Sequence, residues 1–454
     1  MKTWNIADYG AHFTDRLQTE IIQKAIDDCY LAGGGRVVIP CGVYVTGDLR
    51  LRSGVELYLE TGAILKGSRD PKEYFHYRAD TIEPVEIETV GKTPDKCRSA
   101  IATSAWSNGL IRAFDAENIA VTGEPGAYID GCDCYDPEGE DHYRGPHGMS
   151  FWRCKNIRLT GYTFINSSNW CHAIFHSQNI TARDISVYGG HDGFDVRTCD
   201  NVLLENCVFN TGDDAVAGFD NNDVVIRNCV LNSACRPLRF GGNNVLVENC
   251  RSDARDFGFR HHLSDEQKKV GGPATEEQCR RDSPALFGYY CDHRAMLRKP
   301  AEKILIRNFY SAQNDEIIRL EFTGLHRWCC NRSMREITYE NVTIENVTRA
   351  GMLWGDENEK VICRFKHCRF VAKKGCGKDP LFVAANFEKI LFEDCVLEGF
   401  EDPAIWAATD DPVEVIRSTP VKVLKKTQAE CFAMHPYGIP VEDLGKNLTF
   451  KLHP

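Results

Sequence analysis

The sequence has no run of eighteen apolar residues, so it predicts no helix that spans a membrane. Its first residues, Met-Lys-Thr-Trp-Asn-Ile-Ala-Asp-Tyr-Gly, lack the basic and then apolar stretches of a secretory signal peptide. It also lacks a surplus of basic residues, since its net charge is −11. That charge argues against nucleic acid as a partner and against long-range attraction of a polyanionic polysaccharide.

Cysteine is abundant, but it lacks the spacing that zinc sites and small disulfide scaffolds show. The chain has 21 cysteines, an odd number, and no Cys-x-x-Cys pairs at zinc spacing. Cys207, Cys229 and Cys250 each follow Asn at the same place in a repeat. This pattern indicates buried thiols stacked along a core. We therefore expect a reduced, cytoplasmic protein and assign no metal and no cofactor.

A repeat of about 22 residues determines the expected fold. Asn or Asp followed by a β-branched residue opens successive segments, at steps of 23, 22, 22 and 21 residues: Asn156, Asn179, Asn201, Asp223 and Asn244. Each segment continues as a short strand, and the Leu-rich signature of leucine-rich repeats is absent. The pattern predicts an all-β protein, a right-handed single-stranded parallel β-helix in which three sheets run along the stack.

The repeat also sets the expected domain organisation, a single β-helix domain over residues 1–454. Residues 1–70 should hold the N-terminal cap and first coils, including a capping helix within 17–33 whose apolar stripe is Ile21, Ile22, Ala25, Ile26 and Cys29. The main solenoid should cover 100–395. Insertions at 131–146 and 263–300 should form loops on the binding face, and 400–454 should fold over the far end as a cap.

Polar residues recur at one register of consecutive coils. Asp192, the pair Asp213 and Asp214, and Cys235 follow one another at steps of 21 or 22 residues. Stacked coils would hold them about 4.8 Å apart per rung. Carboxylates so close together raise at least one pKa, which provides the protonated acid and the ionised base of glycoside hydrolysis. The alternative is that these aspartates are solvated turn residues.

Several motifs, in this order along the chain, resemble the polygalacturonase-type glycoside hydrolases (family 28), which are inverting β-helix enzymes. The motifs are Ala7-Asp8-Tyr9-Gly10-Ala11, Gly33-Gly34-Gly35, Val38 to Tyr44, Leu59 to Leu65 and Tyr128-Ile129-Asp130-Gly131. The resemblance runs from about residue 6 to 262. It implies that Asp213 is the general acid and that Asp192 and Asp214 hold and activate the water, at the separation of roughly 6.5–9.5 Å typical of inversion.

The family's other signatures are altered on the substrate side. Its Asn-Thr-Asp-Gly element reads Gly190-His191-Asp192-Gly193, its Gly-His-Gly element reads Ala234-Cys235-Arg236, and its Arg-x-Lys element reads Arg260-His261-His262. The family's cation pair for a sugar carboxylate is thus reduced to Arg260 and a titratable His262, unless Arg236 or Arg239 supplies the fork. The substrate-binding candidates are His191, Cys235, Arg236, Arg260, His262 and Trp170.

We therefore expect an exo-acting, inverting glycosidase that removes a terminal sugar, neutral or uronic, from short plant-type oligosaccharides. The insertions favour exo action, because they could block one end of a cleft. A Ca²⁺-dependent uronic-acid polysaccharide lyase and a non-catalytic carbohydrate-binding β-helix remain the alternatives. The expected partner is an oligosaccharide or glycoside, with no nucleic acid and no membrane. The sequence does not indicate the oligomeric state.

Overall fold

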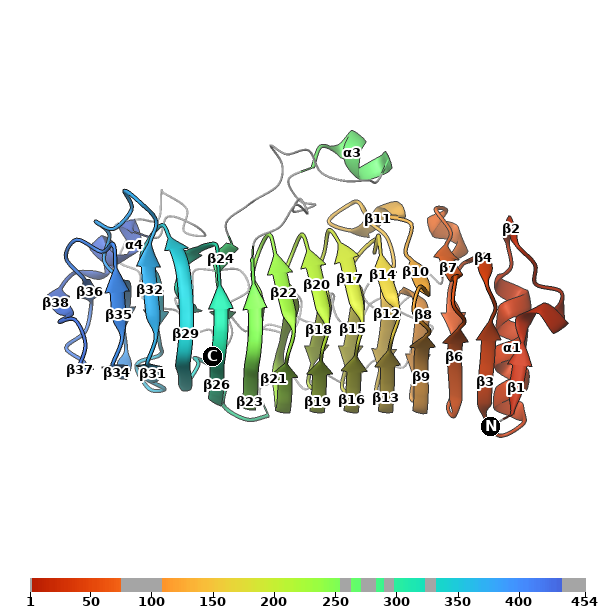
Figure 1. Ribbon diagram of the computed structural model, residues 1–454, viewed down its shortest axis with the longest axis horizontal. Coiled ribbons are helices and arrows are strands. Elements are labelled where there is room, and N and C mark those ends of the chain that lie inside the picture. Colours follow the sequence, from red (N-terminus) through yellow and green to blue (C-terminus); the bar gives the residue numbers. More distant parts are fainter. Residues whose placement is uncertain are drawn as a thin grey trace.

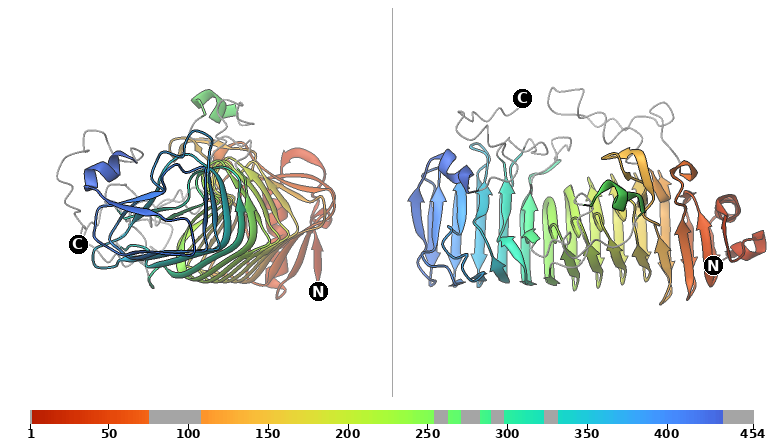
Figure 2. Two further views of the ribbon diagram at one scale, coloured as in Figure 1. Left: turned by 60° about the vertical axis from the view of Figure 1, so that its left-hand side comes forward. Right: turned by 90° about the horizontal axis from the view of Figure 1, so that it is seen from above.

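The chain forms a right-handed parallel β-helix, which confirms the expected fold class. The computed structural model describes residues 2–74, 108–253, 263–270, 283–289, 298–322 and 332–434. Figure 1 shows the coils stacked along the long axis of the molecule, and Figure 2 shows the stack obliquely and from above. Every strand pairing in the main sheet is parallel, between one coil and the next, as in β13 with β16 and β16 with β19.

The pairings define three columns of strands, as predicted. The first contains β1 (Thr3–Asn5), β3 (Gly35–Ile39), β6 (Val55–Leu59), β9 (Glu117–Gly123), β13 (Lys155–Thr160), β16 (Gln178–Arg183), β19 (Asp200–Glu205), β31 (Val361–Lys366), β34 (Phe387–Glu393) and β37 (Val413–Ile416). The second contains β2 (Thr14–Leu17), β4 (Gly42–Thr46), β7 (Ala63–Gly67), β10 (Tyr128–Asp130), β14 (Thr163–Ile165), β17 (Ser186–Gly189), β20 (Val208–Thr211), β22 (Val230–Ser233), β32 (Arg369–Ala372) and β35 (Val396–Glu398).

The third column contains β5 (Leu49–Arg50), β8 (Gly109–Phe114), β12 (His147–Trp152), β15 (His172–Phe175), β18 (Phe194–Arg197), β25 (Phe287–Tyr289), β28 (Arg319–Glu321), β30 (Gly351–Trp354), β33 (Phe382–Ala385), β36 (Ala404–Ala407) and β38 (Lys422–Lys425). Four long strands bend around corners and belong to two or three columns: β21 (Val216–Arg227), β23 (Leu238–Ser252), β26 (Glu302–Ser311) and β29 (Glu336–Val347). They join the columns into one continuous sheet.

The Asn of the sequence repeat is a corner residue. Asn156, Asn179 and Asn201 each have φ 57°, in the left-handed region that Asn tolerates better than most side chains do. Their amides also form a ladder, in which Asn179 donates to Asn156 at 2.8 Å and Asn201 donates to Asn179 at 3.0 Å. The repeat therefore marks the position where each coil turns into a strand of the first column.

The predicted thiol column is confirmed. Cys207, Cys229 and Cys250 are buried in the core on successive coils. Each Sγ donates to a backbone carbonyl one coil back, at 3.6–3.8 Å, and the Cys250 sulfur accepts from the Cys229 N–H at 3.4 Å. The thiols behave as small apolar core residues with a weak donor.

The N-terminal end is capped as predicted, by α1 (Thr19–Leu31), which follows a short 3-10 helix η1 (Ile6–Tyr9). Ile22, Ala25, Ile26 and Cys29 of α1 are buried against the first coils, while Ile21 is partly buried. A second 3-10 helix, η2 (Pro71–Glu73), follows β7. None of the helices in the described ranges is long and apolar enough to cross a membrane.

The expectation for the C-terminal end is wrong in part. Strand pairing continues past Gly399, through β36, β37 and β38, because Ile405 and Ala407 still alternate into the core after the Asn signature has been lost. Helix α4 (Gln428–Ala433) then packs on the outer face of the third column and not over the end. Its Phe432 ring stacks on Trp354 at 4.6 Å.

The two predicted insertions differ from each other. Residues 131–146 contain β11 (Tyr135–Glu140), and helix α3 (Asp265–Val270) lies against it through Lys268 Nζ, 4.5 Å from the centre of the Tyr143 ring. In Figure 1, β11 and α3 project from the edge at which β17, β20 and β22 end. The range 263–300 is not wholly a loop, because β24 (Ser283–Ala285) pairs with β27 (Asn314–Glu316) and β25 is a strand of the third column.

Candidate active site

The predicted catalytic residues lie on stacked turns between the second and third columns. These turns follow β17, β20 and β22, and their backbones are hydrogen-bonded from one turn to the next. Gly193 N–H donates to Asp214 O and Ala215 N–H donates to Arg236 O, both at 2.9 Å. This ladder holds Asp192, Asp214 and Arg236 at one register on successive rungs, about 4.8 Å apart.

The turns bring the three carboxylates together. The Asp214 N–H donates to Asp192 Oδ1 at 3.2 Å and to Asp213 Oδ1 at 3.0 Å. The hydroxyls of Thr211 and Ser233 each donate to the carbonyl of Asp213 at 2.7 Å, which fixes the turn. Asp192 and Asp214 are each 2% exposed, whereas Asp213 is half-buried. Asp213 is therefore the carboxylate of the three that is most open to a ligand.

Burial and mutual repulsion shift the protonation of this cluster. Burial, followed by the charge of Asp214, raises the pKa of Asp213 to about 6. Burial, together with Asp213 and Asp214, also raises the pKa of Asp192, while Arg239 acts in the opposite direction. The cluster therefore retains a proton near pH 6, as a general acid requires.

One oxygen of Asp213, one oxygen of Asp214 and the Cys235 sulfur all lie within 4.8 Å of one another. The separation of roughly 6.5–9.5 Å between the Asp213 carboxyl group and the water-activating pair stays a prediction, because this limit joins nearest atoms and does not include Asp192. These three groups are also a possible donor set for a cation, although the guanidinium of Arg239 already contacts Asp214.

Sequence reasoning missed a buried ionic chain behind the carboxylates. Arg239, considered from the sequence only as a fork for the substrate, donates instead to Asp214 Oδ2, to Asp192 Oδ2 at 3.2 Å and to Asp195 Oδ2 at 3.4 Å. Arg197 makes two hydrogen bonds to Asp195, at 2.9 and 3.0 Å. The sequence contained a signal for this series of ion pairs, because Asp195 and Arg197 are two apart on a strand and Arg239 follows Asp195 by two repeats.

The predicted substrate-binding residues fall into three groups. Cys235 is half-buried beside Asp213, and Arg236 donates to its sulfur at 3.7 Å, so both lie at the carboxylates. His191 is 0% exposed and its ring stacks with that of Tyr143 at 6.0 Å, so it supports the turn and does not present a ring to substrate. Arg260 and His262 lie outside the described residues.

Trp170, a predicted substrate-binding residue, is covered by other side chains. It is 4% exposed, the Arg197 guanidinium lies 4.5 Å from its ring centre, and the ring of His147 lies 5.2 Å from it. A covered indole cannot stack on a pyranose, so Trp170 packs the outer face of the third column together with Trp152 and Phe175.

A buried histidine supports the turn of Asp192 from the core. His172 Nδ1 lies 2.8 Å from the Gly193 carbonyl oxygen and Nε2 lies 2.8 Å from the Tyr162 hydroxyl. Burial lowers the pKa of His172 to about 4, so the ring is neutral and donates from Nδ1 to the carbonyl. The Asp192 turn is thus fixed from its inner side.

The insertion 131–146 brings charged groups to the same edge. Arg144 is 5% exposed and lies 3.1 Å from Asp141, and it donates to Asn169 at 3.2 Å. Its charge lowers the pKa of Asp213, against the larger effects of burial and Asp214. The insertion therefore contributes to the electrostatics of the site as well as to its shape.

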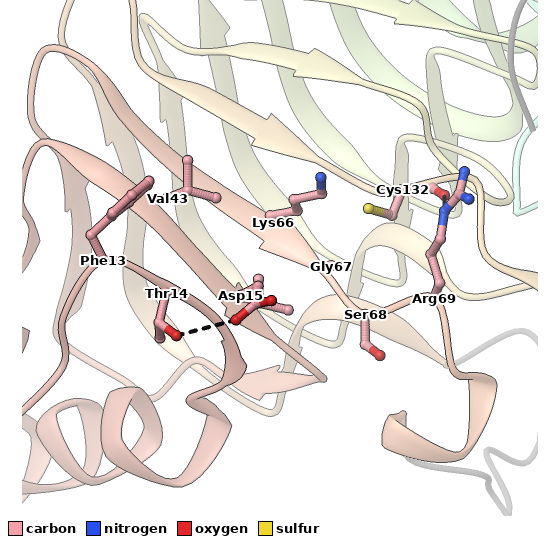
Figure 3. A pocket seen from close by; sticks show the side chains of 10 residues that line it. Phe13, Thr14, Asp15, Val43, Lys66, Gly67, Ser68, Arg69 and Cys132 are labelled. Carbon is pink, nitrogen blue, oxygen red and sulfur yellow. Dashed lines mark hydrogen bonds between the residues drawn. The ribbon is translucent and has the colours of Figure 1, made fainter.

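A separate pocket of about 850 Å³ lies towards the N-terminal end of the stack. Figure 3 shows it between Phe13 at one end and Arg69 and Cys132 at the other, with Lys66 between them. The Arg69 guanidinium donates to the carbonyls of Cys132 at 3.3 Å and Val270 at 2.9 Å, which ties α3 to this region. The aspartate cluster does not contribute to its lining.

Comparison with known proteins agrees with this geometry. The chain matches the model of Glycosyl hydrolases family 28 over residues 83–234, a range that includes Asp192, Asp213 and Asp214. It is 25% identical to a probable polygalacturonase of Vitis vinifera over 213 residues, 44% of this chain and 40% of that protein. It is 26% identical to an exo-poly-alpha-D-galacturonosidase of Dickeya chrysanthemi over 254 residues, 47% of this chain and 41% of that protein. The chain thus spans about two fifths of the length of these two relatives.

Among solved structures, the hyperthermoactive exopolygalacturonase of Thermotoga maritima is similar, with a TM-score of 0.62 at 19% identity, covering 88% of this chain and 92% of that one. At this identity the likeness shows the fold. The family model and these relatives confirm the resemblance to polygalacturonase-type glycoside hydrolases that the motifs predicted.

Proposed function

We propose that this protein is an exo-acting glycoside hydrolase that removes a terminal sugar, most favourably a uronic acid, from short oligosaccharides. One observation carries the proposal. Asp214 Oδ1 is buried and accepts no hydrogen bond from the described residues. It lies in the same cluster as Asp213, whose pKa is raised to about 6. A free base oxygen beside a protonated acid is the arrangement that hydrolysis of a glycosidic bond requires.

In the proposed reaction, the Asp213 proton goes to the glycosidic oxygen as its bond to the anomeric carbon breaks. A water bonds to that carbon from the opposite face and loses a proton to Asp214 Oδ1. Asp192 lies beside Asp214 on the side of the cluster that holds this water. Inversion follows from the family resemblance, because the short distance between Asp213 and Asp214 does not itself distinguish the stereochemical outcomes.

The permanent cation Arg236, one rung beyond Asp214, supports a substrate that carries a carboxylate. The similarity to an exo-poly-alpha-D-galacturonosidase supports the same choice. The insertion that bears β11, with α3 against it, lies over the coils that precede Asp192, so it would limit how far a sugar chain extends on that side. Such a limit favours removal of single terminal sugars. The net charge of −11 favours short chains over polygalacturonan, because long polyanions are repelled more strongly.

The test is an assay of the wild-type protein and Asp213→Asn on di- and trigalacturonides, polygalacturonan and neutral aryl glycosides. We expect release of monosaccharide from short galacturonides, loss of turnover by orders of magnitude in the variant, and the inverted anomer by proton NMR in the first minutes. An unsaturated product with absorbance near 235 nm would identify a lyase instead. Binding of galacturonides without turnover would support the non-catalytic alternative.

We also propose that the protein works in a reducing, cytoplasmic compartment. Each cysteine within the described ranges has a free thiol, and Cys207, Cys229 and Cys250 pack as core residues. Protein that is unfolded and alkylated at the moment of cell lysis should carry 21 alkyl groups by intact mass. A lower number that rises on reduction would contradict this proposal.

A further inference from the structure

A single arginine connects the catalytic carboxylates with the rest of the third column. Arg239 lies on β23, in register with Asp195 on β18 through Ala217 on β21. Two rungs span about 9.6 Å, and a side chain as long as arginine can cross them only if the intervening residue is small. Ala217 meets that condition. Arg239 is 9% exposed, so its charge acts in a largely desolvated position.

The guanidinium contacts both carboxylates on the water side. Its Nε donates to Asp214 Oδ2 and its Nη2 donates to Asp192 Oδ2 at 3.2 Å. Asp192 Oδ1 accepts from the Asp214 N–H, so both Asp192 oxygens have donors. Of the four oxygens in this pair, Asp214 Oδ1 has no hydrogen bond from the described residues. The contacts thus leave one defined oxygen to accept a proton.

The arginine is in turn held by a second ion pair. Asp195 Oδ2 accepts from Arg239 at 3.4 Å, and both Asp195 oxygens accept from Arg197. The Arg197 guanidinium lies between two aromatic rings, 4.5 Å from the centre of Trp170 and 4.7 Å from that of Phe219. Asp195 is 0% exposed. This packing fixes Asp195, and so fixes the second carboxylate contact of Arg239.

We infer that Arg239 is a positioning residue of the hydrolytic site, which holds Asp192 and Asp214 as the water-activating pair and is itself oriented by the Asp195–Arg197 ion pair. The inference rests on the proposed function. Arg239 touches neither the sugar nor the water in this arrangement. It occupies Asp214 Oδ2, so the proton that leaves the attacking water passes to Oδ1 while Asp213 protonates the leaving oxygen.

The test uses opposite changes of charge at two buried positions. Arg239→Gln removes the cation that acts to lower the pKa of Asp192, so that pKa rises and the acidic limb of the kcat–pH profile should move to higher pH. Asp195→Asn removes an anion, so the same limb should move to lower pH. The groups that face the pair and whose charges enter the profile are Asp213, Asp195, Arg239, Arg197, Arg144 and Cys235.

The two variants and a conservative one also separate geometry from charge. Arg239→Gln should lower kcat by about 100-fold, the loss expected when reacting groups are displaced by about 1 Å, with KM changed by less than about threefold. Arg239→Lys keeps the cation but loses the fork, so it should recover the wild-type position of the acidic limb and only part of kcat.

The matched control is Arg319→Gln, because Arg319 is another buried arginine of the third column, paired with Glu316 at 3.2 Å and Glu321 at 3.0 Å. It should lose stability and keep both pH limbs. Limbs that stay fixed in Arg239→Gln and Asp195→Asn, or that move in the same direction, would overturn the inference while leaving hydrolysis by the wild type intact. A wild-type protein without hydrolase activity would overturn the proposed function instead.

Discussion

Asp213 should destabilise the folded protein at neutral pH, because it is ionised there in a place that favours its protonated form. Its pKa is raised from 3.8 to about 6. A difference of this size corresponds to about 3 kcal/mol of folding free energy at most, since one pKa unit is worth about 1.4 kcal/mol. The penalty is absent below pH 4, grows as the pH rises from 4 to 6 and is complete above 6.

Asp213→Asn should remove this penalty, because the amide oxygen can still accept from the Asp214 N–H. We expect urea denaturation to show a variant that is more stable than the wild type at pH 8, by up to about 3 kcal/mol, and equally stable at pH 3.5. Asp8→Asn, at an exposed position near the N-terminus, controls for the change in net charge. A variant less stable than the wild type at pH 8, or an advantage that does not depend on pH, would refute the reasoning.

Other perturbations follow from the same structure. The wild-type kcat should fall above about pH 6, as Asp213 loses the proton it donates, and a pH–rate profile flat to pH 8 would contradict its role as the acid. Activity should survive dialysis against EDTA, because Arg239 already contacts Asp214; loss that Ca²⁺ restores would favour a metal-dependent reaction. Asn179→Ala should cost about 1–2 kcal/mol in thermal unfolding, because alanine is strained at φ 57° and breaks the amide ladder, and Asn179→Gly should cost less. Cys229→Ser should lower the melting temperature without changing the circular dichroism spectrum, because it places a stronger polar group among apolar neighbours. An unchanged melting temperature would argue against a core thiol.

The repeat was sufficient to predict the fold, because a solenoid restates its local signal at every coil. The corner Asn and the β-branched residue after it appear at Asn156, Asn179 and Asn201 with one spacing and one backbone conformation. Where that signal is lost, the prediction fails. The strands β36 to β38 lack the corner Asn, and a long insertion separates β25 from β23, so both were misassigned.

The site was predictable only as far as it depends on register. A constant spacing placed Asp192 one rung from the Asp213–Asp214 pair, and the backbone ladder puts Asp192 in register with Asp214. The burial of the site side chains could not be predicted from register, because it depends on which residues cover the outer face of the third column. Sequence spacing could not show that His191 and Trp170 are covered, or that Arg239 reaches back past Ala217.

The charges of the cluster give a reason, independent of any resemblance, why Asp213 should be the acid. Asp192, Asp213 and Asp214 carry three negative charges in a desolvated turn, and Arg239 offsets one of them, while the Asp195–Arg197 pair is neutral overall. Burial therefore favours the uptake of a proton. Arg239 acts against the rise in the pKa of Asp192. Asp213 is the most exposed of the three carboxylates and its pKa is raised to about 6, so a glycosidic oxygen can reach a proton held there.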